Sequence, residues 1–347
     1  MKISRFHKLP ATARTRRIHA AVLGMLGAGA LVLSGCSTTG TASSTTDTAA
    51  GTSVSATESA DSTANSSGEA TAAIAITSTD QLADATHYDS DDAVYEDSDV
   101  TTVTLSGTSA TASGPDSSDI SVSEADGEAI VTISGTGTYR LSGTLTGQVV
   151  VTSDSEAAVQ LILDDASITS STGPAINITS ADEVTVVLAQ DSQNTLTDAT
   201  TRPSDESDPN TEASAALYSK ADLTVTGAGS LAVTGNYDDA IHSKDGLVID
   251  GPNITVTAVD DGIIGKDYLV LVSGSVNVTS TDTGFGSDND EEENRGWLSI
   301  LGGSLTVATD DDGVKAENAI AISGGTVDVT KSEEGIEAAR ILISDGT

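Results

Sequence analysis

The feature that most constrains the fold is an internal repeat in the second half of the sequence. A short motif, with one or two acidic residues, a small residue and then an apolar residue, recurs along the chain. Its small residues are spaced by 22, 22, 29 and 22 residues, at Ala240, Gly262, Gly284, Gly313 and Gly335. Each motif is followed by an apolar strand, a Gly turn and a second apolar strand. A unit this short cannot bury its apolar face alone, so we expect successive units to stack and share one core.

The period and the residue types together predict an all-β fold. The runs are short, rich in Val, Ile, Leu and Thr, and separated by Gly, Ser, Asp and Asn, which is typical of strands and turns. A unit of about 22 residues with three short strands is typical of one coil of a parallel β-helix, a solenoid. In such a fold, one apolar position of each unit forms an internal stack, made of Ile241, Ile263, Phe285, Val314 and Ile336.

Stacked coils would align the acidic residues in two columns. The first column contains Asp238, Asp260, Asp282, Asp311 and Glu333. The second contains Asp239, Asp261, Asp312 and Glu334, and is interrupted by Thr283. Neighbouring strands lie about 4.8 Å apart, and two carboxylates at that distance repel by roughly 3.5 kcal/mol at an effective dielectric constant near 20.

A bound cation would relieve this repulsion, and clustered carboxylates with nearby carbonyl groups suit Ca²⁺. The alternative is that these residues are solvated turn residues, since Asp before Gly is ordinary turn chemistry. We favour Ca²⁺ because the acidic residues recur in register. A third column holds Lys220, Lys244 and Lys266, followed by Asp288 and Glu317. These lysines either neutralise neighbouring carboxylates, which we favour, or contact an anionic ligand.

The N-terminus is predicted to be a lipoprotein signal peptide, residues 1–36. It has a basic region without acidic residues, a short apolar region over 20–33, and then Leu33-Ser34-Gly35-Cys36, which looks like a bacterial lipobox. Cys36 is the only cysteine of the chain, so we expect lipidation there and no disulfide in the mature protein. An ordinary signal peptide is the alternative. We expect a secreted protein, anchored by lipid at the extracellular face of the cell membrane.

Local composition predicts the boundary between a linker and the folded body. Residues 37–95 are predicted to be a flexible linker, because their first part is Ser, Thr, Ala and Gly with few large apolar side chains and cannot offset chain entropy by burial. The stretch 81–100 is ambiguous, and one interpretation is a cap on the first coil. Residues 96–347 are predicted to be the folded body. The chain ends where another strand should follow, so we expect a truncated or irregular last coil.

The charge balance limits the partners. The chain has 15 basic and 52 acidic residues and a formal net charge of −37 at pH 7. Such a surface repels nucleic acid, so we expect no nucleic-acid partner, and we expect a monomer. A halophilic or simply soluble surface is the alternative explanation.

Several motifs resemble those of a known family of bacterial surface proteins, the carbohydrate-binding parallel β-helix family. They are GTYRLSGTL at 137–145, GPAI at 173–176, NTLTD at 194–198, ALYSK at 216–220, SDND at 287–290 and Gly296-Trp297. The resemblance covers roughly residues 125–347. It implies a right-handed single-stranded parallel β-helix similar to pectate lyases, calcium sites at the acidic turns, and binding of plant-type polysaccharide, including acidic sugars, without established catalysis. Asp288 and Asp290, in the motif at 287–290, are then further candidate metal ligands.

The sequence also departs from the family pattern. Thr283 and the pair Glu333-Glu334 weaken individual calcium ligands, and Ala240 replaces Gly in the first acidic turn.

Three functions remain open. The first is polysaccharide binding without catalysis, to acidic plant-type glycans such as polygalacturonate, with cellulose as a further candidate. The scarcity of aromatic residues argues against crystalline cellulose as the main ligand. The candidate ligand-binding residues for this function are Lys220, Lys244, Lys266, Tyr237, Tyr268 and Trp297. The three aromatic residues either stack on sugar rings or cover turns, and the sequence leaves both open. The second is a calcium-dependent polyuronate lyase with Lys244 or Lys266 as base; fold analogy alone supports it weakly. The third is a structural adhesin or cell-wall spacer stiffened by calcium.

Overall fold

The computed structural model describes residues 75–153, 158–204, 208 and 210–347. These residues belong to one compact unit, Gly68–Thr347. The predicted signal peptide, Cys36 and the first part of the predicted linker lie outside the described residues. Within the described part, no helix is both long enough and apolar enough to cross a membrane.

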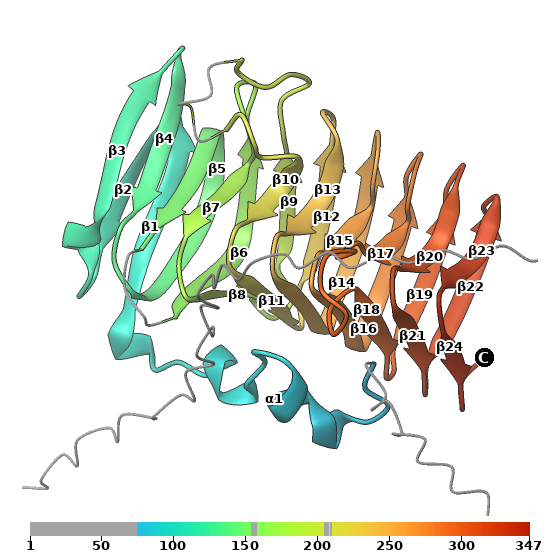
Figure 1. Ribbon diagram of the computed structural model, residues 1–347. Coiled ribbons are helices and arrows are strands. Elements are labelled where there is room, and N and C mark those ends of the chain that lie inside the picture. The colour runs from blue at the N-terminus through green and yellow to red at the C-terminus, as the bar shows by residue number, and fades with distance from the viewer. Residues whose placement is uncertain (1–74, 154–157, 205–207, 209) are drawn as a thin grey trace, which may run out of the picture. The chain divides into compact units, whose positions relative to one another are not determined.

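The described chain begins with short helical turns and then consists of strands (Figure 1). The helical elements are η1 (Thr79–Gln81), α1 (Leu82–Ala85), η2 (Ser90–Ala93), η3 (Asp97–Asp99) and, later, η4 (Ser117–Asp119). Two antiparallel hairpins follow, made of β1 (Val100–Gly107), β2 (Ser109–Ser113), β3 (Ile120–Ala125) and β4 (Glu128–Ile133). All later strand pairings among the described residues are parallel, and they begin with the long strands β5 (Gly137–Thr152) and β6 (Val159–Thr169).

The parallel strands are arranged in three rows. The first row, here the covered face, contains β8 (Glu183–Leu188), β11 (Asp222–Gly227), the first halves of β14 (Gly246–Ala258) and β16 (Tyr268–Thr279), β18 (Trp297–Ile300), β21 (Ala319–Ile322) and β24 (Ile341–Ile343). The second row, here the open face, contains β9 (Gln193–Thr197), β12 (Ser230–Gly235), the second halves of β14 and β16, β19 (Ser304–Ala308) and β22 (Thr326–Lys331).

The third row, here the turn face, follows the acidic turns. It contains β7 (Ile176–Ser180), β10 (Ala215–Ser219), β13 (Asp239–Ser243), β15 (Ile263–Gly265), β17 (Phe285–Ser287), β20 (Asp312–Ala316) and β23 (Glu334–Ala338). Its inward positions form the predicted internal stack, since Ile241, Ile263, Phe285, Val314 and Ile336 are successive register partners. This stack is confirmed, and the first four of its side chains are fully buried.

The predicted fold class is corrected by the strand pairing. β6 pairs with β8 through its first half and with β9 through its second half, and β14 pairs in the same way with β11 and β12. Because β8 also pairs with β11, and β9 with β12, these six strands form a closed parallel ring, and the other strands lie outside it. The expected open, right-handed, single-stranded parallel β-helix is therefore wrong, although the all-β class is confirmed.

The physical reason lies in strand length. We expected separate short strands, whereas β6 and β14 are 11 and 13 residues long and each pairs with two neighbours. In β14 the change of partner coincides with register shifts at Asp250 and Asn253. The number of residues between register partners of successive strands is not uniform either. Leu223 pairs with Leu247, a step of 24 residues, and Leu247 pairs with Leu269, a step of 22 residues.

Residues 75–95 pack on the body instead of forming part of a linker. Ile76 and Leu82 are buried in a cluster with Tyr268 and Trp297 of the covered face. The side chain of Ser299 donates to Ile76 O at 2.8 Å, and that of Gln160 donates to Asp92 O at 2.6 Å. The predicted linker boundary at residue 95 is therefore wrong for residues 75–95. These residues lie along the covered face, so the interpretation of a cap on the first coil is also not supported.

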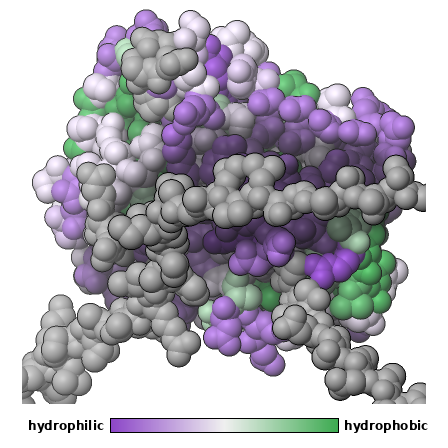
Figure 2. Space-filling model, viewed as in Figure 1, coloured by the Kyte–Doolittle hydropathy of each residue, from purple (hydrophilic) through white to green (hydrophobic). Residues whose placement is uncertain are grey.

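The last strands are more exposed than the rest of the body. Ile341, Leu342 and Ile343 of β24 are 47%, 49% and 62% exposed. Figure 2 shows a hydrophobic patch at this side of the otherwise largely hydrophilic surface in view.

Candidate functional site

The acidic turns lie between the open face and the turn face, and backbone hydrogen bonds hold successive turns in register. Asp260 N donates to Asp238 O at 3.1 Å, and Asp282 N donates to Asp260 O at 3.2 Å. Further along, Glu333 N donates to Asp311 O at 2.8 Å. The structure therefore places the residues of the first predicted column at equivalent positions.

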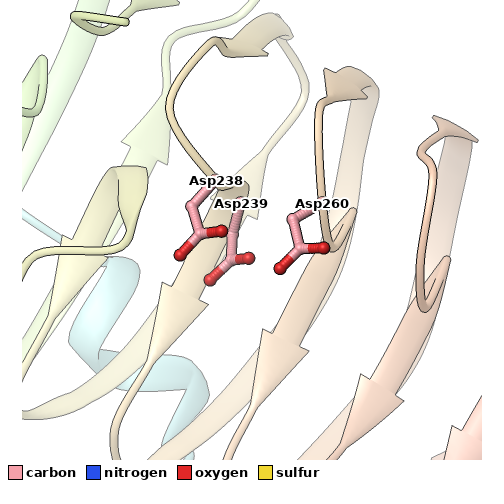
Figure 3. Close-up of side chains that lie close together, drawn as sticks. All are labelled: Asp238, Asp239 and Asp260. Carbon is pink, nitrogen blue, oxygen red and sulfur yellow. The ribbon is translucent and has the colours of Figure 1, made fainter. Parts of the chain in front are cut away.

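Carboxylate oxygens from this column and its neighbour gather in three clusters, in each of which all ligand atoms lie within 4.8 Å of one another. The members are Asp238, Asp239 and Asp260 in cluster 1, Asp260, Asp261 and Asp282 in cluster 2, and Asp311, Glu333 and Glu334 in cluster 3. Figure 3 shows cluster 1, in which Asp260 reaches toward the two carboxylates of the preceding turn. Asp260 belongs to two clusters.

Crowding and burial oppose ionisation in clusters 1 and 2. Burial, followed by the charges of Asp239 and Asp260, raises the pKa of Asp238 to about 7. Burial, followed by the charge of Asp239, raises the pKa of Asp261 to about 8. The pKa of Asp282 is also raised, by burial first and then by Asp311 and Asp260. A divalent cation would stabilise the ionised forms of these groups.

The second predicted column has internal partners. The carboxylate of Asp239 lies 2.7 Å from Nδ1 of the buried His242, and Lys315 Nζ donates to Asp312 Oδ2 at 2.6 Å. At the interrupted position, Thr283 N donates to Asp261 Oδ1 at 2.8 Å. Asp312 lies outside the three clusters, so the structure does not bring this predicted ligand to a cluster.

Ala240 keeps the geometry of its acidic turn. Ala240 N donates to Asp261 O at 3.1 Å, as Gly262 N donates to Thr283 O at 2.8 Å. A Cβ at Gly262 would lie 2.3 Å from Gly284 O, so glycine is required where the next turn approaches this closely. The departure at Ala240 therefore does not disturb the register.

A hollow of about 200 Å³ lies beside cluster 2. Asp261 and Asp282 line one part of it, and Lys315 and Glu317 line another. Its centre is open because Gly286, which has no side chain, lies in register between Ile264 and Lys315. Lys315 is not among the candidate residues predicted from the sequence, although it directly follows Val314 of an acidic repeat. Lys315 places a positive charge near the clustered carboxylates, also lying 3.5 Å from Glu337.

The inserted loop contributes little to the clusters. Asp288 is exposed and lines the hollow, whereas Asp290 is exposed and outside every cluster found among the described residues. The loop is held by Asp267, which accepts from Asn289 Nδ2 at 2.7 Å and pairs with Arg295 at 2.5 Å.

The predicted lysine column has local acidic partners. Lys220 lies 2.6 Å from Glu212, and Lys266 lies 3.6 Å from Glu291. Lys244 is exposed, and its charge contributes to the lowered pKa of Glu212, after that of Lys220. This geometry agrees with the favoured interpretation, in which the lysines neutralise neighbouring carboxylates.

Two of the three predicted sugar-stacking residues are buried. Tyr268 and Trp297 are 4% and 3% exposed, and their rings stack on each other at 5.0 Å under residues 75–88. The prediction that they stack on sugar rings is therefore wrong for this structure. Tyr237 is 40% exposed, and the Arg202 guanidinium lies 4.5 Å from its ring centre.

Known proteins resemble this chain in sequence and in structure. A curated protein of Acetivibrio thermocellus, described as "Carbohydrate-binding domain-containing protein", is 37% identical over 140 residues, which are 40% of this chain and 47% of that protein. This chain thus spans about half the length of that relative. A solved structure, described as "Structure of the polysaccharide lyase-like protein from C. thermocellum, Gadolinium derivative", is 29% identical with a TM-score of 0.66. That match covers 71% of this chain and 99% of the solved chain.

The family comparison covers most of the described body. The family described as "Carbohydrate-binding domain-containing protein" matches residues 126–347, which include the acidic turns and all three rows of strands. The chain therefore belongs to the carbohydrate-binding domain-containing protein family.

Proposed function

We propose that this chain binds polysaccharide along its acidic turns, with Ca²⁺ held by the carboxylate clusters. Family membership and the polysaccharide lyase-like neighbour support polysaccharide as the ligand class. The observation that carries the rest is the presence of three clusters, in each of which the carboxylate oxygens lie within 4.8 Å of one another. Ca²⁺ takes six to eight oxygen ligands, including carboxylates and carbonyl groups, and this donor set fits it.

When calcium is bound, the charges of the site favour binding of an acidic glycan. The bare carboxylates would repel a uronate, whereas a bound cation would attract its carboxylate group. The hollow beside cluster 2 offers space for one sugar residue, and Lys315 supplies a second positive charge there. Polygalacturonate is the acidic glycan that we expect to bind.

The test combines a calcium titration by calorimetry with retention on immobilised polygalacturonate, with and without a chelator. Asp260→Asn removes the carboxylate shared by clusters 1 and 2, and we expect at least a tenfold loss of calcium affinity and of retention. Asp328→Asn, which removes an exposed carboxylate of β22 outside the clusters, is the matched control and should behave as the wild type. Equal retention of the wild type with and without chelator would overturn the calcium proposal.

A lyase is the second candidate, because the structural neighbour is described as polysaccharide lyase-like. Incubation with polygalacturonate and calcium would then produce an unsaturated product with a rise in ultraviolet absorbance. We favour binding without turnover, because likeness of fold alone is a weak warrant for catalysis and Lys266, one of the two candidate bases, is paired with Glu291. If calcium stabilised the protein but no glycan were retained, a structural adhesin or spacer would be the better description.

For localisation we propose lipid attachment at Cys36 and exposure at the cell surface. The lipobox-like sequence before Cys36 supports this proposal. Mass spectrometry of the N-terminal peptide from native membranes should show a lipid-modified Cys36. Release of Cys36→Ala protein into the medium would agree with the same anchor.

A further inference from the structure

The open face carries a polar surface away from the acidic turns. One outward column crosses successive strands through Ser167, Thr195, Ala232, Thr255, Asn277 and Thr306. A neighbouring column contains Gln193, Ser230, Asn253, Ser275 and Ser304. Over these strands neither column contains a charged residue, although the chain has a formal net charge of −37. Charges border this part of the face at Asp328, the register partner of Thr306, and at Asp165, whose Oδ1 accepts from Gln193 N. Between them lies a neutral array of hydroxyl and amide groups on an acidic protein.

This array has a hollow of about 260 Å³. The floor lies at Ala232, whose register partners on both sides are the larger residues Thr195 and Thr255. The side chains of Gln193 and Asn253 stand on either side of Ser230 in the next column. The hollow exists because one strand carries the smallest side chain of its column.

The base of the hollow is rigid. The buried Asn194 uses its amide fully, since Oδ1 accepts from Ala166 N at 2.9 Å, and Nδ2 donates to Ser192 Oγ at 2.8 Å and to Ser230 O at 3.1 Å. Thr195 Oγ1 is held by Ser167 Oγ at 2.7 Å. These contacts fix the backbone of β9 against its neighbours, so the shape of the hollow does not depend on a mobile loop.

The groups around the hollow retain hydrogen-bonding capacity. Among the described residues, no hydrogen bond involves the side chains of Ser230, Asn253 or Thr255, and all three line the hollow. Asn253 and Thr255 are exposed. A hydroxyl both donates and accepts, and an amide does the same through separate atoms. A ligand with many neutral hydroxyl groups matches this set better than an ion does.

We propose that this hollow is a second glycan subsite, which takes an uncharged sugar residue of an extended polysaccharide chain without a metal ion. The inference rests on the proposed function for its ligand class and deepens it. The columns on both sides continue across neighbouring strands about 4.8 Å apart, so adjacent sugar residues of the same chain meet further hydroxyl and amide groups. The residues that line this hollow and those of the three carboxylate clusters do not overlap, so the two sites share no residue.

The test uses neutral probes in the presence of a chelator. Cellohexaose, xylohexaose and mannohexaose are titrated separately into the full chain, and binding is followed by calorimetry and by saturation-transfer NMR. We expect at least one of them to bind without calcium. Ala232→Thr fills the hollow with the residue found on both sides of it and suits a strand, so the fold should persist. It should weaken this binding at least fivefold.

Asn253→Ala should weaken the same binding at least threefold by removing an amide. Ser123→Ala, which removes an exposed polar group of β3 outside both columns, is its control and should bind as the wild type does. Retention on polygalacturonate with calcium should stay unchanged in all three variants. Absence of binding by every neutral probe, or binding that neither Ala232→Thr nor Asn253→Ala weakens, would overturn this inference and leave the proposed calcium site standing. Loss of calcium-dependent retention in the wild type, with neutral binding intact, would instead overturn the proposed function.

Discussion

At the residue scale, the raised pKa values of Asp238 and Asp261 link protons to the candidate metal site. These pKa values, about 7 and about 8, lie above the ordinary value of 3.8. The native protein therefore binds more protons than the unfolded chain between about pH 4 and pH 8. In the absence of metal, the free energy of unfolding should fall as the pH rises through this window.

We predict that calcium affinity rises between pH 6 and pH 8. The ion must displace the protons held by Asp238 and Asp261, so the dissociation constant should fall by up to roughly tenfold per pH unit for each proton released. Calorimetry at three pH values, in buffers with different ionisation enthalpies, would measure both the affinity and the number of protons. A constant affinity without proton release would contradict this prediction.

A buried ion pair gives a second prediction at this scale. Arg202 pairs with Asp198 at 2.6 Å, and their side chains are 2% and 0% exposed. Arg202→Met would leave the Asp198 carboxylate buried without its positively charged partner. Such a loss typically costs about 3–5 kcal/mol in the free energy of unfolding. Denaturant unfolding would measure this loss. Arg340→Met, at an exposed arginine, is the control and should change stability by less than about 0.5 kcal/mol.

At the scale of elements, residues 75–93 form a cover over the aromatic pair of the covered face. His87 N donates to Tyr268 Oη at 2.9 Å, and His87 Nε2 lies 2.9 Å from Thr224 Oγ1. Tyr88 Oη donates to Asp250 Oδ2 at 2.6 Å. The cover thus combines apolar burial with hydrogen bonds to several strands, and it keeps Tyr268 and Trp297 away from solvent.

Trp297 is the single tryptophan of the chain, so its fluorescence reports on this cover. We predict that Leu82→Ala, which removes a side chain only 4% exposed, shifts the emission of Trp297 to longer wavelength. Hydrogen exchange in residues 76–93 should also become faster, because buried apolar contact is lost. Val94→Ala, at a side chain 72% exposed, should change neither. Unchanged emission in Leu82→Ala would show that Leu82 does not hold the cover in place.

At the scale of the whole molecule, the parallel register multiplies the effect of one acidic turn. Backbone hydrogen bonds between successive turns place acidic residues of neighbouring repeats together. The resulting repulsion acts along the length of the body and cannot be relieved by one side chain turning away. A ligand that binds only this native arrangement stabilises the whole fold by mass action.

We predict that calcium raises the melting temperature of the body. At a free calcium concentration 100 times the dissociation constant, one site contributes about 2.7 kcal/mol. Scanning calorimetry with calcium and with a chelator would measure the shift, and Asp260→Asn should reduce it. Sodium chloride should raise the melting temperature of the metal-free protein, because it screens the carboxylates. Identical melting with calcium and chelator would contradict calcium binding by the clusters.

The local and periodic features of this protein follow from its amino-acid pattern alone. Alternation with a period of two specifies which side chains of a strand face the core, and the repeat spacing specifies which residues become register partners. For this reason the all-β class, the stack from Ile241 to Ile336 and the placement of Asp260 among the acidic turns could be predicted. These features require only that equivalent positions of successive units lie side by side.

The way in which distant segments meet is visible only in the folded chain. The closed ring depends on where β6 and β14 change partners, and the burial of Tyr268 depends on His87, 181 residues earlier in the chain. Lys315 and Ala232 acquire their surroundings from neighbouring strands. Neither the position of Lys315 beside cluster 2 nor the hollow at Ala232 is therefore visible in a local pattern. The physical reason is that burial and space are set by the packing of residues far apart in sequence, whereas strand direction and register are set by residues close to one another.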